Sequence, residues 1–204
     1  MPESRRPRIT VFDYGAGNLH SLAKAVASFG IAPVIEVDPV RAVETDLLLL
    51  PGVGAFTPAA ERLSAGADVM RNALRGGLPC LGICLGMQLL FDGSDEGPGA
   101  GLGVIPGRVE RINAARLPQI GWNSLEAPTE ALLDASGLHD VYYANSFICR
   151  PHDVTCVTSW STHEGDRFAA SVRVGRTVGV QFHPEKSSSA GVAFIHAFLK
   201  EMLG

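Results

Sequence analysis

The most informative stretch of this chain is Leu78-Pro-Cys-Leu-Gly-Ile-Cys84-Leu-Gly-Met-Gln-Leu-Leu90. Its first part, through Ile83, is an apolar run that predicts a buried strand, and a helix-like segment follows at once. A cysteine between two glycines at such a junction matches the nucleophile elbow, with sulfur in place of the serine oxygen. The glycines favour a sharp turn that leaves the thiol unobstructed. The N–H groups and positive dipole end of the helix favour the thiolate, so the stretch predicts a covalent catalyst.

Upstream of Cys84, short apolar runs alternate with segments of helical spacing. The runs have no polar alternation, which is typical of strands buried on both faces of a parallel sheet. Helix-favouring segments separate them, and Asn18 and Gly30 are suited to begin and end the first of these. The predicted strands are Arg8–Asp13, Pro33–Val37, Leu47–Leu50 and Cys80–Ile83, and the predicted helices follow Asn18, cover Pro58–Arg75 and run from Leu85 to about Phe91.

Downstream of Gly93 the pattern changes to one dominated by strands. The glycine-rich and acidic segment Gly93–Gly103 predicts a loop, and Asp134–His139 predicts a turn. A closing helix is expected over Ser188–Leu203, where apolar residues recur at helical spacing. The strands expected in this half are Gly107–Ile112, Val141–Cys149, Thr155–Trp160, Phe168–Val174 and Thr177–Phe182. The chain is therefore predicted to form one α/β domain, residues 1–204, with helices on both faces of a central sheet and a strand-rich C-terminal half.

Composition narrows the possible partners and the compartment. The 204 residues are 46% hydrophobic and 19% charged, with a net charge of −4, which suits one compact domain without a nucleic-acid or membrane surface. The four cysteines form no disulfide framework and no zinc spacing, so no metal site is expected, and no cofactor is predicted. The polar N-terminus predicts no signal peptide, and free thiols indicate a reducing cytoplasm.

Cys84 needs a base, and His183 is the best placed of the six histidines. It ends the apolar run Val-Gly-Val-Gln-Phe-His183 and is followed by Pro184 and Glu185. Proline favours an extended conformation for the residue before it, and side chains two apart on extended backbone point the same way. A carboxylate beside an imidazole fixes its tautomer and supports its charged form. Cys84, His183 and Glu185 are therefore a candidate catalytic triad.

An acyl-transfer reaction also needs donors for the oxyanion. The backbone amide of Leu85, just after the nucleophile, is one candidate. The second is expected in the loop Pro51-Gly-Val-Gly54, because the loops at the carboxyl ends of parallel strands share one edge of a sheet. Each element alone has an ordinary structural explanation, but the three together favour a thiol acyl-transferase or hydrolase. A cysteine peptidase, a thiol-bearing binding module and a redox cysteine are the alternatives from other classes.

These motifs resemble those of the class I, or triad, glutamine amidotransferases. Gly82-Ile-Cys84-Leu-Gly86-Met-Gln88 is similar to their nucleophile motif, His183-Pro-Glu185 to their His-x-Glu motif and Pro51–Gly54 to their oxyanion segment. The resemblance implies a class I amidotransferase fold with a largely parallel mixed sheet. Three further segments make the resemblance more specific, to the glutaminase subunits of imidazole glycerol phosphate synthase. These segments are Asp13–Asn18, Pro118–Asn123 and Gln181–Ser187.

The resemblance implies a hydrolase that releases ammonia from glutamine, and a lyase activity in a heterodimer with a (β/α)₈-barrel cyclase of histidine biosynthesis. Val53 and Leu85 would form the oxyanion hole, and Gly52, Gln88, Asn145 and Ser146 would hold glutamine. Asn145 and Phe147 stand where the family often has histidine and tyrosine. The residues that would face the partner are Asp13, Tyr14, Asn18, Pro118, Gln119, Trp122, Asn123 and Lys186. The alternative within this family is a glutaminase for anthranilate, GMP or pyridoxal phosphate synthesis.

Overall fold

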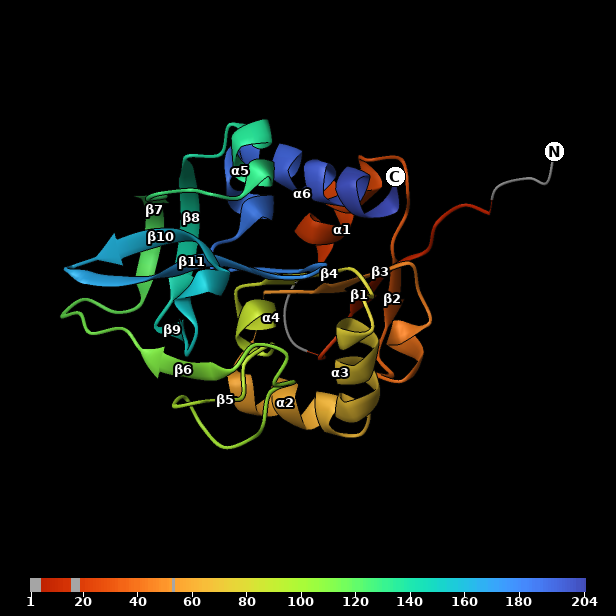
Figure 1. The fold of residues 1–204 in the computed structure, drawn as a ribbon, viewed down its shortest axis with the longest axis horizontal. Helices are drawn as coiled ribbons and strands as arrows, with labels where there is room; N and C mark the ends of the chain where they lie inside the picture. Colours follow the sequence, from red (N-terminus) through yellow and green to blue (C-terminus); the bar gives the residue numbers. More distant parts are fainter. Residues whose placement is uncertain (1–4, 16–18, 53) are drawn as a thin grey trace.

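The computed structural model describes residues 5–15, 19–52 and 54–204, and a seven-stranded mixed sheet runs through its centre (Figure 1). The strand order is β10-β11-β12-β4-β3-β1-β2. The five strands from β12 to β2 are parallel, and β10 and β11 extend the sheet as antiparallel strands. The bounds are β1 Ile9–Phe12, β2 Val34–Glu36, β3 Leu47–Leu50, β4 Cys80–Ile83, β10 Val157–His163, β11 Asp166–Val174 and β12 Thr177–Val180. The predicted α/β class with a largely parallel mixed sheet is confirmed.

Helices cover both faces of this sheet (Figure 1). One face carries α1 (His20–Ala27), α5 (Ala131–Ser136) and α6 (Ser188–Leu203), and the other carries α2 (Phe56–Ser64), α3 (Ala67–Arg75) and α4 (Leu85–Gln88). Alternate residues of β3 enter two separate apolar clusters, Leu47 and Leu49 on one side and Leu48 and Leu50 on the other. Burial on both faces explains why the strand sequences are continuously apolar.

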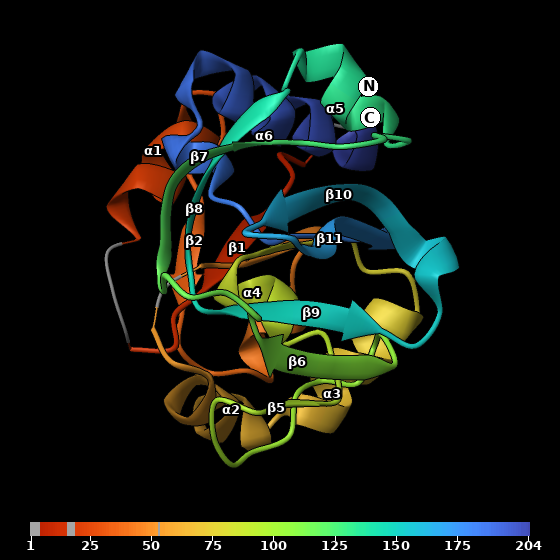
Figure 2. The same ribbon diagram turned by 90° about the vertical axis from the view of Figure 1, so that its left-hand side faces the viewer.

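Two smaller sheets lie beside the β10–β11 end of the central sheet (Figure 2). One contains β5 (Gly93–Ser94), β6 (Gly107–Arg111) and β9 (Phe147–Pro151), and the other pairs β7 (Gln119–Ser124) with β8 (Asp140–Asn145). Short 3₁₀ turns complete the chain: η1 (Arg41–Val43), η2 (Val154–Cys156) and η3 (Pro184–Lys186). The strand-rich C-terminal half therefore adds β10, β11 and β12 to the central sheet and forms the two smaller sheets beside it.

The two predicted helices that flank β4 are both shorter than expected. The segment Pro58–Arg75 is two helices, because Gly66 leaves helical geometry and lies so close to Pro39 that a Cβ there would be 2.8 Å from its Cγ. The helix after Cys84 ends at Gln88, not near Phe91. The carbonyls of Leu89 and Leu90 instead accept hydrogen bonds from the loop around Leu102 and Val104.

Two predictions in the C-terminal half were also wrong, and one strand was not predicted. Asp134–His139 is not a simple turn, since α5 begins at Ala131 and ends where Gly137 adopts φ 64°. The predicted strand Val141–Cys149 breaks at Ser146, because β8 pairs with β7 whereas β9 pairs with β6. β7 itself was missed, and a glycine and polar residues interrupt the apolar pattern of this strand.

Among the described residues, no helix combines the length and the apolar character needed to cross a bilayer.

Candidate active site

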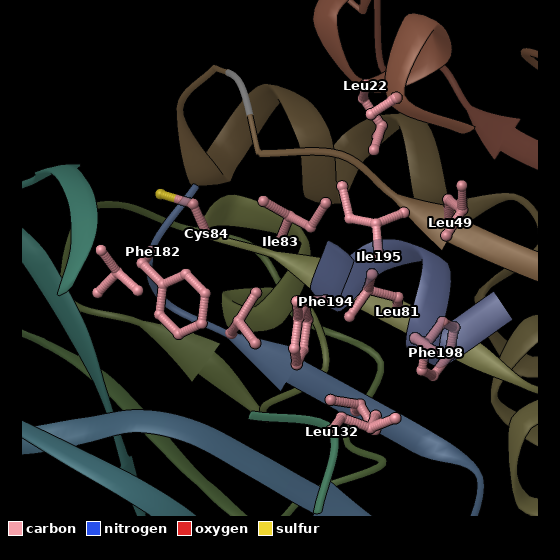
Figure 3. Close-up of a cluster of buried hydrophobic side chains, with 14 of the residues drawn as sticks. Leu22, Leu49, Leu81, Ile83, Cys84, Leu132, Phe182, Phe194, Ile195 and Phe198 are labelled. Atoms are coloured by element: carbon pink, nitrogen blue, oxygen red, sulfur yellow. The ribbon is translucent and has the colours of Figure 1, made fainter. Parts of the chain in front are cut away.

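Cys84 occupies a strained turn between β4 and α4. Its backbone has φ 47° and ψ −102°, a conformation that non-glycine residues seldom adopt outside functional sites. The turn is held by the Cys84 N–H, which donates to the Val180 carbonyl at 2.7 Å. The residue is 7% exposed and lies at the end of an apolar cluster, with its sulfur pointing away from the labelled hydrocarbon side chains (Figure 3). The fold thus presents the thiol at the edge of the sheet where the parallel strands have their carboxyl ends.

The two flanking glycines serve close packing rather than the sharp turn itself. The positive φ belongs to Cys84, and neither Gly82 nor Gly86 has one. A Cβ on Gly86 would overlap the carbonyl oxygen of Leu50 in the neighbouring strand. A Cβ on Gly82 would lie 2.8 Å from the Gly86 carbonyl carbon and oxygen. The prediction that these glycines make the turn is corrected: they let α4 pack directly onto β3 and β4.

His183 and Glu185 form a buried pair beside Cys84. β12 pairs in parallel with β4 so that Val180 is opposite Ile83, and the segments that follow these two strands leave the sheet at the same edge. His183 is 2% exposed, and its Nδ1 lies 2.8 Å from the Glu185 Oε1 atom. The expectation that both lie on extended backbone was wrong for Glu185. His183 is extended, but Glu185 lies in η3, where the 3₁₀ turn folds the carboxylate back onto the imidazole.

The charge state of His183 follows from this environment. Burial alone lowers its pKa, but hydrogen bonds to Cys84 and Glu185 outweigh that cost and raise the pKa to about 10. The imidazole is therefore protonated at neutral pH and lies within hydrogen-bond reach of the Cys84 sulfur. An imidazolium beside a thiol favours the thiolate form of a nucleophile.

Replacing Glu185 with glutamine should lower the pKa of His183. The neutral amide still accepts from Nδ1 but removes the negative charge, which is worth about 1–3 pKa units at this distance. A folded-state pKa raised from 6.5 to about 10 stabilises the protein fully below pH 6.5, and this contribution is lost as pH rises through about 10. The wild type should therefore lose stability relative to E185Q over that range. NMR titration of the His183 ring and denaturation at several pH values check both effects; an unchanged titration would contradict the assigned pair.

A cavity of about 200 Å³ adjoins the Cys84 sulfur. Of the predicted site residues, it brings together Cys84, Leu85, Gln88, Asn145 and Ser146. The remaining lining residues are Gly54, Glu96, Pro118, Ala144 and Phe147. A wider cavity of about 450 Å³ lies beside Trp122, but no member of the candidate triad lines it. The smaller cavity is therefore the candidate substrate site.

Two amide side chains on the wall of the smaller cavity are fixed by the same carbonyl. Gln88 Nε2 and Asn145 Nδ2 both donate to the Phe147 carbonyl oxygen, at 3.1 and 2.9 Å. The Asn145 Oδ1 atom is buried, with no hydrogen-bond partner among the described residues. With both NH₂ groups held by the protein, these side chains can offer their oxygens as acceptors to a ligand amide or ammonium group.

Gly52 packs against both reacting groups. A Cβ at this position would lie 3.0 Å from the Cys84 Cβ and 3.0 Å from the His183 Cε1 atom. The loop after β3 therefore reaches the same sheet edge as Cys84 and His183, as the parallel topology predicts. Val53, the predicted second oxyanion donor, lies outside the described residues, as does Asn18.

The residues expected to face a partner differ in how much of each is exposed to solvent. Pro118, Trp122 and Lys186 are exposed, Trp122 by 57%, and Asp13 and Asn123 are half-buried. Tyr14 and Gln119 are buried, so their side chains contribute little to the surface of the chain by itself. Tyr14 packs edge-on against Phe12 in the core beneath the sheet. Lys186 directly follows Glu185 in η3, so an exposed cation adjoins the buried pair.

Two polar residues at this site were not predicted from the sequence. Glu96 lines the cavity and accepts from the Phe56 N–H at the start of α2, although its segment indicated only a loop. Gln181 is fully buried and its Nε2 lies 3.6 Å from the Cys84 sulfur. In the sequence, Gln181 stands out only as the first residue of the Gln181–Ser187 motif. Its position two residues before His183 is the signal that could have placed it near the site.

A buried cysteine, histidine and glutamate that converge in this way on an α/β sheet define the class of triad amidotransferases. The class-I glutamine amidotransferase family model matches residues 10–202. The imidazole glycerol phosphate synthase subunit HisH of Thermus thermophilus is 42% identical over 195 residues, covering 93% of this chain and 94% of that protein. HisH of Acaryochloris marina is 39% identical over 204 residues, covering 96% and 95%. The chain belongs to the class-I glutamine amidotransferases and, within them, to the HisH family.

Solved structures agree in fold at much lower sequence identity. A crystal structure of a glutamine amidotransferase superposes with a TM-score of 0.74 at 20% identity, covering 96% of this chain and 99% of that one. The structure of PurLQS from Thermotoga maritima gives a TM-score of 0.73 at 18% identity, covering 96% and 99%. At these identities the two likenesses show the fold alone.

Proposed function

We propose that this chain is the glutaminase subunit of imidazole glycerol phosphate synthase. It hydrolyses glutamine to glutamate and ammonia, and passes the ammonia to a cyclase subunit in histidine biosynthesis. The observation that carries the chemistry is the convergence of Cys84, His183 and Glu185 at one sheet edge, beside a small polar cavity. The names of relatives that are about 40% identical over nearly the whole chain support the pathway.

The reaction begins with attack by the Cys84 thiolate on the side-chain amide carbon of glutamine. A carbon–sulfur bond forms, and the carbonyl electron pair moves to the oxygen. The Leu85 N–H, at the start of α4, donates to this oxyanion, and Val53 is the proposed second donor. Collapse of the intermediate breaks the carbon–nitrogen bond. The His183 imidazolium gives its proton to the departing nitrogen, which leaves as ammonia.

The second half of the reaction hydrolyses the thioester. Neutral His183 takes a proton from water as the water oxygen attacks the thioester carbon, and the same donors hold the second oxyanion. Its collapse breaks the carbon–sulfur bond and returns Cys84 to the thiolate. Glu185 keeps the imidazole in one tautomer through both halves, because its Oε1 accepts from Nδ1. Glutamate then leaves the cavity.

We propose that the cavity wall holds the amino-acid end of glutamine. The oxygens of Gln88 and Asn145 accept hydrogen bonds from the substrate, and the backbone at Gly52 and Ser146 lies alongside it. Glu96 supplies a carboxylate to a cavity that otherwise has no acidic lining residue among those described. A free amino acid carries an ammonium group, so this carboxylate is suited to anchor it by a charge-assisted hydrogen bond.

Replacing Glu96 with glutamine should raise KM for glutamine with a smaller effect on kcat. The change removes the charge but leaves an acceptor for the Phe56 N–H, so α2 keeps its N-terminal contact. Loss of a hydrogen bond to a charged group costs about 1.5–3 kcal/mol, or roughly 10- to 100-fold in KM. Steady-state kinetics measure it, with the exposed Glu61→Gln on α2 as a control. An unchanged KM would exclude this role.

We further propose that residues 1–204 form one amidotransferase domain that docks on a (β/α)₈-barrel cyclase as a heterodimer. The family match over residues 10–202 supports a single unit. The exposed Trp122 and Lys186 are the described residues best placed to meet the partner, and Pro118 adds a third contact at the cavity rim. A cytoplasmic location suits the biosynthetic role.

The proposal is tested by measuring glutamate release with and without the purified cyclase subunit and its nucleotide ligand. Stable complex formation and faster glutamine hydrolysis in its presence are expected. If no complex forms and no stimulation occurs, the histidine-pathway assignment is wrong. Parallel mixtures with the synthases for anthranilate, GMP and pyridoxal phosphate would then identify the true acceptor of the ammonia.

A further inference from the structure

We propose that Gln181 is a positioning residue for the nucleophile: its side-chain amide donates a hydrogen bond to the Cys84 sulfur from behind the substrate cavity. This inference rests on the proposed glutaminase function and deepens it. Nε2 of Gln181 lies 3.6 Å from the Cys84 Sγ atom, and the side chain is fully buried. It does not line the substrate cavity. A polar side chain in such a place acts on the sulfur rather than on glutamine.

Gln181 is held in place by its backbone as well as by its side chain. It directly follows β12, and its N–H donates to the Ala170 carbonyl of β11 at 2.8 Å. Its chain neighbour Phe182 is fully buried and packs against Phe194 of α6. The amide therefore has little freedom to leave the sulfur, and no solvent competes for its N–H.

The chemistry of its neighbours fixes which end of the Gln181 amide faces Cys84. Its Oε1 atom lies 3.5 Å from Gln88 Nε2 and 3.9 Å from the Cys149 Sγ. Gln88 Nε2 is a donor there, because it also donates to the Phe147 carbonyl. The Cys149 thiol is a donor too, since burial raises its pKa well above the usual value and keeps it protonated. Two donors on one side require the amide oxygen there, so the NH₂ group must face the sulfur.

The arrangement gives Cys84 two hydrogen-bond donors, the imidazolium of His183 and the amide of Gln181. A buried thiolate needs such partners, because an unpaired charge inside a protein is costly. Gln181 also links the nucleophile to Gln88, which lines the substrate cavity. One buried network therefore orients the attacking sulfur and a side chain proposed to hold the substrate.

Two substitutions remove the donor while keeping the volume. Gln181→Glu is isosteric and keeps an oxygen for Gln88 and Cys149, and Gln181→Met is similar in length but neutral. Each should lower kcat for glutamine by about tenfold with KM unchanged, because a hydrogen bond to a charged group is lost outside the substrate cavity. Labelling of Cys84 by iodoacetamide at neutral pH should slow by a similar factor, and it should be slower in Gln181→Glu than in Gln181→Met because a carboxylate repels the thiolate.

The control is Ser159→Ala, which removes another buried hydrogen bond, between Ser159 Oγ and Ser171 Oγ at 2.6 Å. Ser159 lies in β10, far from Cys84 both in the sequence and in the order of the strands. It should leave kcat, KM and labelling unchanged. Thermal unfolding verifies that each variant is folded. If neither Gln181 variant folds, NMR of the wild-type Gln181 side-chain amide replaces them: its proton shift should change when iodoacetamide alkylates the Cys84 sulfur, and an unresponsive amide overturns the inference.

The outcomes separate this inference from the proposed function. A wild-type protein that neither hydrolyses glutamine nor labels at Cys84 contradicts the proposed function. An active wild type whose Gln181 variants keep full kcat and full labelling rates contradicts the role of Gln181 alone. A rise in KM with unchanged kcat would also overturn it, since that result would place Gln181 in substrate binding.

Discussion

Replacing Cys84 with alanine should abolish glutamine hydrolysis, with a loss of about 10⁴-fold or more. The substitution removes the sulfur that is proposed to form the thioester, and neither His183 nor Glu185 can replace it as a nucleophile in this geometry. The fold should survive, because the Cys84 backbone bond to Val180 does not involve the side chain. Glutamate release by the isolated subunit and by its complex with the cyclase measures the loss.

The same variant should spare synthesis from added ammonium in the complex, because only ammonia production depends on the thiol. Cys156→Ala is the matched control, since its thiol lies in η2 and bonds to the Asp153 carbonyl away from the cavity. It should retain full activity with both nitrogen sources. Equal loss of glutamine- and ammonium-dependent synthesis in the Cys84 variant would contradict a role limited to glutamine hydrolysis.

Replacing Gly86 with alanine should damage both stability and activity. The new methyl group would overlap the Leu50 carbonyl, so α4 must move away from β3. Overpacking of this kind costs about 1–3 kcal/mol of unfolding free energy. Because α4 begins immediately after Cys84, the nucleophile and the Leu85 N–H move with it. A displacement of about 1 Å at a reacting group can lower kcat by roughly 10²-fold. Thermal or chemical denaturation and steady-state kinetics measure the two effects.

Gly93→Ala provides the comparison, because a Cβ there would meet nothing closer than 3.4 Å and Gly93 has no positive φ. It should leave both properties near the wild-type values. A stable and fully active Gly86→Ala protein would show that the close contact between α4 and β3 does not hold the elbow in place.

The parallel core and the triad could be predicted because their signals are local and strong. Continuously apolar runs such as Leu47–Leu50 follow from burial on both faces of the sheet, and parallel topology brings their carboxyl ends to one edge. Cys84 and His183 both lie just beyond such ends, so the parallel pairing of β4 and β12 explains how they meet although 98 intervening positions separate them in the chain.

The remaining features depend on contacts that the sequence pattern does not encode. The break at Ser146 exists because β8 and β9 pair with different partners, which no local propensity reveals. Glu185 reaches His183 through a 3₁₀ turn, although Pro184 suggested extended backbone. Gln181 and Glu96 are ordinary polar residues in sequence, and only packing brings one to the sulfur and the other to the cavity.

Labelling with an electrophilic glutamine analogue, followed by peptide mass spectrometry, tests whether Cys84 is the nucleophile that attacks glutamine. Cys84 must combine nucleophilicity with access to a glutamine-shaped cavity, whereas Cys80 and Cys149 are buried and burial raises the pKa of both thiols. We expect one adduct, on Cys84, whose formation is slowed by added glutamine and abolished in Cys84→Ala. Labelling of another cysteine, or labelling of Cys84 that glutamine does not slow, would contradict it.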